Sequence, residues 1–255
     1  MSIDTDMGSQ LREVMERRGI KMPTPEELAE HRKRIAAEDA EMAREFQTRT
    51  MQSVYKRDSL YNGLAKTFTF DQWDPARQFE PKQVEQAAKV KQKALNMVQE
   101  FNAGHNFNVA MMGGAGVGKT AMSLAMMDAV KSNRTVMFVS TAELAETMRG
   151  QFDDPDLKQR AKYIEESMKT VDILILDDFG TEVSLNTGGA EATNFIQRLY
   201  FRVASAREGK STVVTTNETR ATLEQMYNPK IISRLLTRDP AHQLNFTSLF
   251  DLRQV

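Results

Sequence analysis

The pattern of apolar and polar positions changes near residue 75. Before that point charged residues are dense and apolar residues are sparse. After it, four short apolar runs and a weaker fifth recur between stretches of helical character, at residues 108–112, 135–140, 171–176, 212–216 and 242–246. Apolar strands that alternate with helices predict a parallel sheet covered on both faces. We therefore expect an α/β fold with a parallel five-stranded sheet.

The stretches of helical character predict helices at residues 82–101, 119–132, 142–152, 156–169, 189–207 and 219–236. Between the charged part and the first of these helices lies the segment 59–81. It contains one glycine, two prolines and several aromatic residues, a composition that predicts an ordered connector. We divide the chain into a helical arm with its connector, 1–75, and a larger domain, 76–255.

The arm is predicted to contain one long helix. Thr24 can cap it, Pro25 suits its first position, and Glu27 stands where a capping box needs an acid. No glycine or proline follows until Gly63, and the apolar stripe is narrow: Leu28, Ile35, Met42, Phe46 and Val54. Two interpretations stay open. The helix is either a solvated arm (or hairpin with residues 10–20), or a docking element whose stripe another protein covers.

Composition and charge narrow the functional classes. The length of 255 residues fits one core with an appended segment. With 34 Lys+Arg against 35 Asp+Glu, the net charge of −1 argues against a wholly electrostatic nucleic-acid binder. The absence of cysteine excludes disulfides, thiolate metal sites and thiol catalysis. No leader-like start and no long apolar run occur, so we expect a cytoplasmic protein with no membrane contact.

The candidate chemistry begins with GGAGVGKT at residues 113–120, which we call the phosphate loop. It matches G-x-x-x-x-G-K-[ST] directly after an apolar run and before an apolar helix. Glycines let successive N–H groups converge on phosphate oxygens, Lys119 adds a charge between the β- and γ-phosphates, and Thr120 can ligate Mg²⁺. We expect ATP or ADP with Mg²⁺, bound by Gly113, Gly114, Ala115, Gly116, Val117, Gly118, Lys119, Thr120 and Ala121.

Two further apolar runs end in polar residues at the edge of the sheet where the phosphate loop is expected. The run 171–176 ends in Asp177 and Asp178. We expect Asp177 to hold Mg²⁺ through water and Asp178 to orient and activate the attacking water. The run 212–216 ends in Asn217, an amide that can help to hold that water. Together these residues predict ATP hydrolysis.

The segments GGAGVGKT, LILDDFG, VVTTN and IISRLL resemble, in order and spacing, the AAA+ ATPases of the DnaC/DnaI helicase-loader type, whose siblings are the IstB transposition ATPases. The resemblance covers roughly residues 64–255, including KTFTFDQW at 66–73. It implies an AAA+ P-loop NTPase fold with no C-terminal lid, preceded by a small helical N-terminal domain. Many AAA+ proteins have Glu where this chain has Asp178, which suggests slow turnover.

The resemblance also implies roles for single residues. Asn217 falls at the sensor position. Arg234 falls where the family places an arginine finger that reaches the γ-phosphate of a neighbouring subunit, and such a finger makes hydrolysis depend on assembly. Arg253 resembles the second sensor arginine. Arg238, one helical turn after Arg234, competes for the role of the finger.

The resemblance predicts an ATP-dependent loader of a replicative, DnaB-type helicase, bacterial or phage. Residues 1–75 would dock on the helicase, and the ATPase domains would self-associate in an ATP-dependent spiral on single-stranded DNA. The loop 184–189 and six basic or aromatic side chains suit phosphates and bases: Arg149, Lys158, Arg160, Lys162, Tyr163 and Lys169. Acidic residues lie between these six, so a solvated charged face is an equal interpretation.

Three alternatives remain. An IstB-like transposition helper would use the same chemistry with a transposase as partner and duplex DNA as track. A small-molecule P-loop kinase is disfavoured by the consecutive acid pair and the asparagine, which favour hydrolysis. A non-hydrolysing adaptor would keep bound ADP as a structural element.

Overall fold

The computed structural model describes residues 14–15, 17–19, 24–64, 67–130, 133–150, 155–184 and 193–254. The chain forms two compact units that divide between Gln47 and Thr48. This division lies upstream of residue 75, where the composition changes. The reason is that Tyr55, Leu60 and Trp73 are buried in the hydrophobic clusters of the second unit.

Helix α2 (Pro25–Asp58) begins in the first unit as the sequence predicts. The backbone N–H of Thr24 donates to Glu27 Oε2 at 2.7 Å, and the backbone N–H of Glu27 donates to Thr24 Oγ1 at 3.2 Å. These two bonds form the expected capping box. The side chains of Leu28, Ile35 and Met42 are exposed, so this part of the helix buries little of its apolar stripe.

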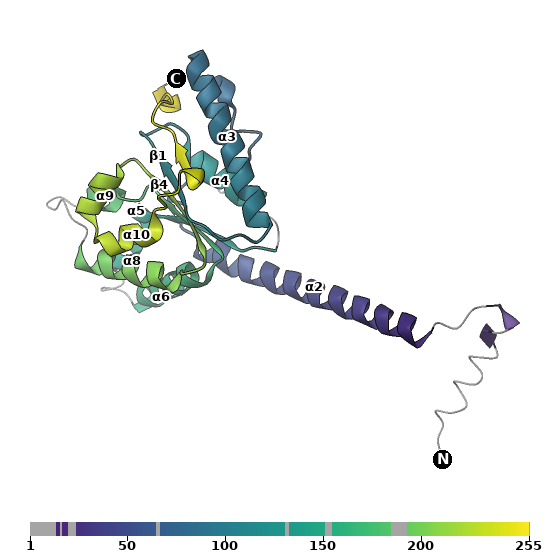
Figure 1. Cartoon of the computed structure of the whole chain (residues 1–255). Helices are drawn as coiled ribbons and strands as arrows, with labels where there is room; N and C mark the ends of the chain where they lie inside the picture. The colour runs from purple at the N-terminus through teal and green to yellow at the C-terminus, as the bar shows by residue number, and fades with distance from the viewer. Residues whose placement is uncertain are drawn as a thin grey trace. The chain divides into compact units, whose positions relative to one another are not determined.

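The second unit contains a five-stranded sheet in the order β2-β3-β4-β1-β5. Figure 1 shows β1 and β4 within this sheet, with helices around it. All neighbouring strands pair in parallel, which confirms the predicted α/β fold with a parallel five-stranded sheet. The strands are β1 (Val109–Met112), β2 (Val136–Ser140), β3 (Ile173–Asp177), β4 (Ser211–Thr216) and β5 (Gln243–Asn245). Because β1 is an interior strand between β4 and β5, the loop that follows β1 lies next to the carboxyl ends of both neighbouring strands.

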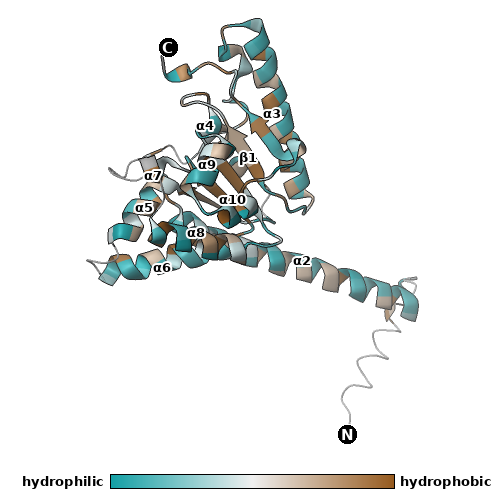
Figure 2. Ribbon diagram, turned by 60° about the vertical axis from the view of Figure 1, so that its left-hand side comes forward, coloured by the Kyte–Doolittle hydropathy of each residue, from teal (hydrophilic) through white to brown (hydrophobic). Residues whose placement is uncertain are grey.

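Helices cover both faces of the sheet, and Figure 2 shows hydrophobic residues concentrated in the strands. Ile173 and Ile175 belong to one hydrophobic cluster with α3 (Pro81–Asn102) and α4 (Lys119–Ala129). Leu174 and Leu176 belong to the other, on the opposite face. That face carries α5 (Thr141–Gly150), α6 (Pro155–Thr170), α7 (Thr181–Ser184) and α8 (Asn194–Ala206). Burial on both faces explains why the strands are almost continuously apolar.

The prediction of one continuous helix over 219–236 is wrong. The structure has α9 (Arg220–Met226) and α10 (Pro229–Leu235). Asn228 accepts a hydrogen bond from the N–H of Lys230 at 2.9 Å and caps α10, with Pro229 in its first turn. Asparagine before proline favours a new helix start over continuation, because proline cannot supply the N–H that an uninterrupted helix needs.

The last turns of α2 and the start of the connector cover the open edge of the sheet at β2. The side-chain amide of Gln52 donates to Val136 O at 2.9 Å and accepts from Val136 N at 2.8 Å. The N–H of Leu60 donates to Phe138 O, and the N–H of Ser140 donates to Leu60 O, each at 2.8 Å. An edge strand with unpaired backbone groups can pair with a strand of another chain and so promote aggregation. These bonds occupy the edge of β2 and prevent such pairing. In the described part of the chain, no helix combines the length and apolarity needed to span a bilayer.

Candidate nucleotide-binding site

The phosphate loop joins β1 to α4 at the carboxyl end of the sheet. Gly118 is the N-cap of α4 and has φ +94°. Gly116 has φ +72°, and both values lie in the left-handed region that favours glycine. The loop therefore turns directly into a helix N-terminus, where free N–H groups and the helix dipole favour phosphate.

Residues distant in the sequence hold the loop from two sides. The indole Nε1 of Trp73 donates to Gly118 O at 3.2 Å. The N–H of Leu252 donates to Gly116 O at 3.1 Å. The carboxylate of Asp251 occupies the space beside Gly116, so that a Cβ added at Gly116 would lie 1.5 Å from Asp251 Oδ1. Asp251 and Leu252 could not be predicted from the sequence, because no local pattern links them to the loop.

Gly116→Ala is expected to destabilise the protein and to weaken ATP binding. The left-handed φ costs a residue with a Cβ about 1–2 kcal/mol, and the methyl group displaces Asp251 and the following segment. Gly209→Ala is the matched control, because Gly209 has φ +77° with no atom within 4 Å of the added Cβ. Thermal unfolding should report similar backbone strain in both variants. Equal ATP affinities in calorimetry would contradict the steric role of Gly116.

Lys119 and Asn217 meet at the loop. The ammonium Nζ donates to Gly113 O at 2.8 Å, to Gly114 O at 2.6 Å and to Asn217 Oδ1 at 2.7 Å. Burial lowers the pKa of Lys119, and the carboxylates of Asp178 and Asp177 oppose that shift. The structure thus brings the lysine of the loop into contact with the predicted sensor amide at the end of β4.

Thr120 and Asp177 also lie in contact. The hydroxyl of Thr120 donates to Asp177 Oδ2 at 3.0 Å, and the hydroxyl of Thr215 donates to Oδ1 at 2.7 Å. Burial raises the pKa of Asp177 to about 6, and the bond from Thr215 opposes this rise. In the described ranges no three His, Cys, Asp or Glu side chains form a metal cluster. A hydroxyl beside one or two carboxylates fits Mg²⁺, which takes its other ligands from phosphates and water.

Asp178 is held in a strained turn. It is a non-glycine residue with φ +54°, a conformation that Asp tolerates better than most residues. Its N–H donates to Thr215 Oγ1, and Thr141 Oγ1 donates to its carbonyl, each at 2.9 Å. Thr215 therefore orients both acids. This role of Thr215 was not predicted, although a threonine inside a buried strand is a signal in the sequence that could have indicated it.

A cavity of about 440 Å³ lies at this site, and Asn217 and Thr215 are not among its lining residues. Lys119, Thr120, Asp177, Asp178 and Arg253 line its polar part. Its other lining residues include Asn62, Leu64 and Phe68 from the connector. The structure therefore places Arg253 together with the loop and the acid pair.

Arg234 lies elsewhere. It is exposed on α10, where its guanidinium donates to Lys230 O at 3.0 Å and lies 5.4 Å from the centroid of the Phe201 ring. The side chain of Arg238 is 80% exposed, and its guanidinium lies 3.9 Å from Glu224 Oε1. Neither arginine lines the cavity of its own chain.

A buried carboxylate connects the acid turn to the corner between α9 and α10. Glu182 is 2% exposed. Its carboxylate accepts hydrogen bonds from the N–H of Gly180, at 3.1 Å, and from the hydroxyl of Tyr227, the residue after α9. Phe179 stacks on the Tyr227 ring at 4.6 Å between centroids. Glu182 could not be predicted from the sequence, because an acid in a short helix carries no local sign of burial.

Glu182→Gln is expected to reduce the pH dependence of stability. Burial raises the pKa of Glu182, so the folded protein holds more protons at this group than the unfolded protein does. The free energy of unfolding of the unmodified protein therefore falls, relative to the variant, as pH rises above the ordinary glutamate pKa. Thermal unfolding between about pH 4 and pH 8 measures this difference, with exposed Glu208→Gln as control. Parallel curves for the unmodified protein and Glu182→Gln would contradict it.

The parallel sheet, the loop at a helix N-terminus and the acid pair beside it define a P-loop ATP-binding protein of the AAA+ class. The sequence model of the IstB-like ATP binding proteins matches residues 31–245. The chain belongs to this family. No curated protein matches the sequence.

Solved structures share the fold. AMPPCP-bound DnaA from Aquifex aeolicus aligns with TM-score 0.53 and 16% identity over 73% of this chain and 52% of that one. A candidate primosome component from Streptococcus pyogenes aligns with TM-score 0.50 and 16% identity over 76% of this chain and 95% of that one. A DNA replication initiation factor aligns with TM-score 0.50 and 17% identity over 68% of this chain and 48% of that one. The chain spans about half of the length of the DnaA structures.

Proposed function

We propose that this protein is an assembly-dependent ATPase that loads a replicative helicase. One observation carries the ATPase part: Lys119, Thr120, Asp177, Asp178 and Arg253 line a single cavity. In this proposal the loop and Lys119 bind the phosphates and Asp178 orients and activates the attacking water. Thr120 and Asp177 would hold Mg²⁺, which neutralises phosphate charge when it is bound.

The position of Arg234 supports a reaction that depends on assembly. Because Arg234 is exposed and absent from the cavity of its own chain, its guanidinium is accessible to the site of a neighbouring copy. An arginine supplied in trans stabilises the spread charge of the transferring phosphoryl group. We propose Arg234 for this role and Asn217 and Arg253 for the sensor roles.

The arm and α6 supply the partner surfaces of the proposal. The exposed Leu28, Ile35 and Met42 form an apolar stripe on α2, which suits binding in a hydrophobic groove of a helicase. On α6, four exposed residues suit single-stranded DNA: Lys158, Arg160, Lys162 and Tyr163. Lys169 does not join them, because its ammonium pairs with Glu165 at 2.7 Å and Glu166 at 2.9 Å. The loop 184–189 lies, after Ser184, outside the described residues.

A helicase-delivery assay tests this function with the full-length chain. Lys119→Ala is expected to weaken ATP binding about a hundredfold, since it removes several charge-assisted bonds to phosphate, and to stop delivery of the helicase to single-stranded DNA. The triple variant Leu28→Ala/Ile35→Ala/Met42→Ala should keep ATP binding and lose the helicase. Unchanged delivery by Lys119→Ala, or unchanged helicase binding by the triple variant, would contradict the proposal.

The family match supports a second candidate, a transposition helper of the IstB type. It has the same ATP chemistry but binds a transposase and duplex DNA. Pull-down with a helicase and with a transposase, each with and without ATP, separates the two functions. Retention of the transposase alone would replace the first proposal.

A further inference from the structure

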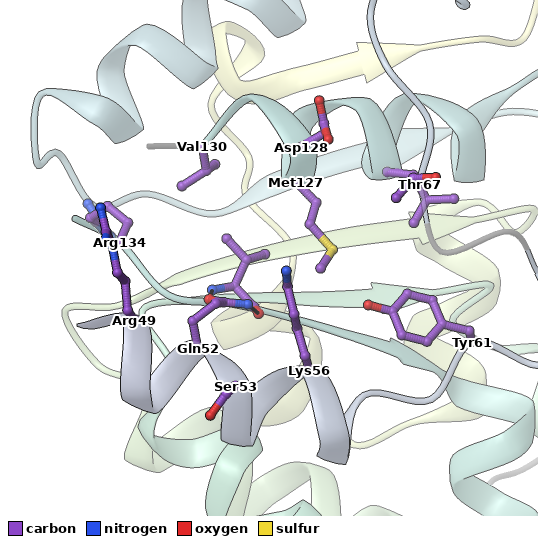
Figure 3. Close-up of a pocket in the computed structure, with 12 residues that line it drawn as sticks. Arg49, Gln52, Ser53, Lys56, Tyr61, Thr67, Met127, Asp128, Val130 and Arg134 are labelled. Atoms are coloured by element: carbon purple, nitrogen blue, oxygen red, sulfur yellow. Dashed lines mark hydrogen bonds between the residues drawn. The ribbon is translucent and has the colours of Figure 1, made fainter. Parts of the chain in front are cut away.

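Figure 3 shows a second cavity, of about 620 Å³, which shares Leu124 with the nucleotide cavity. It lies between the last turns of α2 and the second half of α4, wholly inside the unit 48–255. Leu124 lines both cavities, but no residue of the phosphate loop lines this one. The second cavity is therefore a separate space that the proposed ATP chemistry does not use.

Three cationic side chains gather at this cavity. Figure 3 shows Arg49 beside Arg134, and the ammonium of Lys56 pointing into the space between α2 and α4. Among the described residues, Arg134 donates to three neutral acceptors: Phe101 O at 3.1 Å, His105 O at 3.3 Å and Asn106 Oδ1 at 2.6 Å. Its Nε is buried and has no hydrogen-bond partner among the described residues.

The cavity does not neutralise these charges. In the described ranges of the chain, Arg49, Lys56 and Arg134 form no ion pair within 4 Å. Among the described residues that line the cavity, Asp128 alone is acidic, and its carboxylate points away from Lys56 (Figure 3). Like charges that converge without a counter-charge favour a bound anion.

The remaining walls suit a flat, partly apolar group. Leu124, Met127, Val130 and Val136 provide apolar surface. Tyr61 stacks on Phe138 with 5.2 Å between ring centroids and an interplanar angle of 2°, and its hydroxyl points toward Lys56 (Figure 3). The volume lies within the range of small-molecule sites, which are mostly apolar with a few polar groups.

We propose that this cavity binds a nucleoside phosphate. Arg49, Lys56 and Arg134 contact the phosphate, the Tyr61 hydroxyl offers a hydrogen bond to it or to the sugar, and the base packs against Met127 and Val130. The same chemistry is offered by a free nucleotide and by one nucleotide unit of a single strand. The site is distinct from the phosphate loop, so it can bind its ligand while ATP or ADP occupies the loop.

Calorimetry on the full chain saturated with ADP tests the site. Thymidine monophosphate and a ten-residue thymidine oligonucleotide are the probes, with inorganic pyrophosphate for comparison. We expect a further binding event that becomes at least tenfold weaker in Arg49→Ala/Lys56→Ala. Both side chains are exposed, so their removal leaves the core intact. The matched control is Arg32→Ala/Lys33→Ala, which removes the same two charges from α2 outside the cavity.

Binding of the monophosphate identifies a free nucleotide as a sufficient ligand, and binding of the oligonucleotide alone identifies a strand. Either result, with loss only in Arg49→Ala/Lys56→Ala, supports the site. The proposal is overturned if neither probe binds, if both double variants lose binding equally, or if pyrophosphate binds as tightly as the monophosphate. Titration of the same variants with ADP measures nucleotide binding at the phosphate loop separately. A failure of the proposed ATPase function can therefore be told apart from a failure of the second site.

Discussion

Arg234→Ala is expected to lower assembly-stimulated ATP hydrolysis by about 10³- to 10⁵-fold while the ATP affinity of each chain stays unchanged. The guanidinium of Arg234 is exposed on α10 and does not line the cavity that holds Lys119 and Asp177. Its removal therefore leaves the binding site of its own chain complete. What is lost is the charge that one copy supplies to the γ-phosphate of the next.

A mixing experiment shows whether the arginine acts between copies. Arg234→Ala retains its nucleotide site, and Lys119→Ala retains its arginine, so a mixture of the two inactive variants should recover part of the hydrolysis. Arg238→Ala is the control, because it removes another exposed arginine three residues past the end of α10. If Arg238→Ala abolishes hydrolysis and Arg234→Ala does not, the role belongs to Arg238. Absence of recovery in the mixture would contradict action in trans.

Asp178→Asn is expected to slow hydrolysis by about 10²- to 10⁴-fold, the usual contribution of a general base, without weakening ATP binding. The amide keeps the size of the side chain. It also leaves untouched the backbone bonds from Asp178 N–H to Thr215 and from Thr141 to the Asp178 carbonyl, so the turn at φ +54° persists. Only the carboxylate that activates water is removed.

Single-turnover hydrolysis and ATP calorimetry, measured on the same preparation, separate these effects. Asp177→Asn is the informative comparison, because Asp177 bonds Thr120 and lies at the proposed Mg²⁺ position. That variant should lose Mg²⁺-dependent ATP affinity, whereas Asp178→Asn should retain it. If Asp178→Asn hydrolyses ATP at the unmodified rate, Asp178 is not the base.

The sheet and the centre of the site could be predicted from local patterns. The phosphate loop, the acids at the end of β3 and the amide at the end of β4 each follow an apolar strand. Parallel strands place such ends at one edge, and the contact between Lys119 and Asn217 follows from this rule. Helix α2 was predictable for a similar reason, since its capping residues are adjacent in the sequence.

The contacts that were not predicted join distant segments or depend on burial. Trp73 and Leu252 bond the phosphate loop from outside any motif, and Glu182 pairs with Tyr227 inside the core. Periodicity and spacing carry no information about such pairs. The break between α9 and α10 differs, because Asn228-Pro229 is a local signal that outweighs the helical periodicity around it.

The bonds of Trp73 and Leu252 to the phosphate loop set the limits of a minimal nucleotide-binding fragment. The family match ends at residue 245. A fragment cut there would keep the phosphate loop, both acids, Asn217 and Arg234. It would lack the Leu252 bond to Gly116 and the Arg253 side chain in the cavity. A fragment for nucleotide-binding measurements therefore has to begin before Trp73 and continue through Arg253. A start before Gln52 would also keep the bonds at the β2 edge.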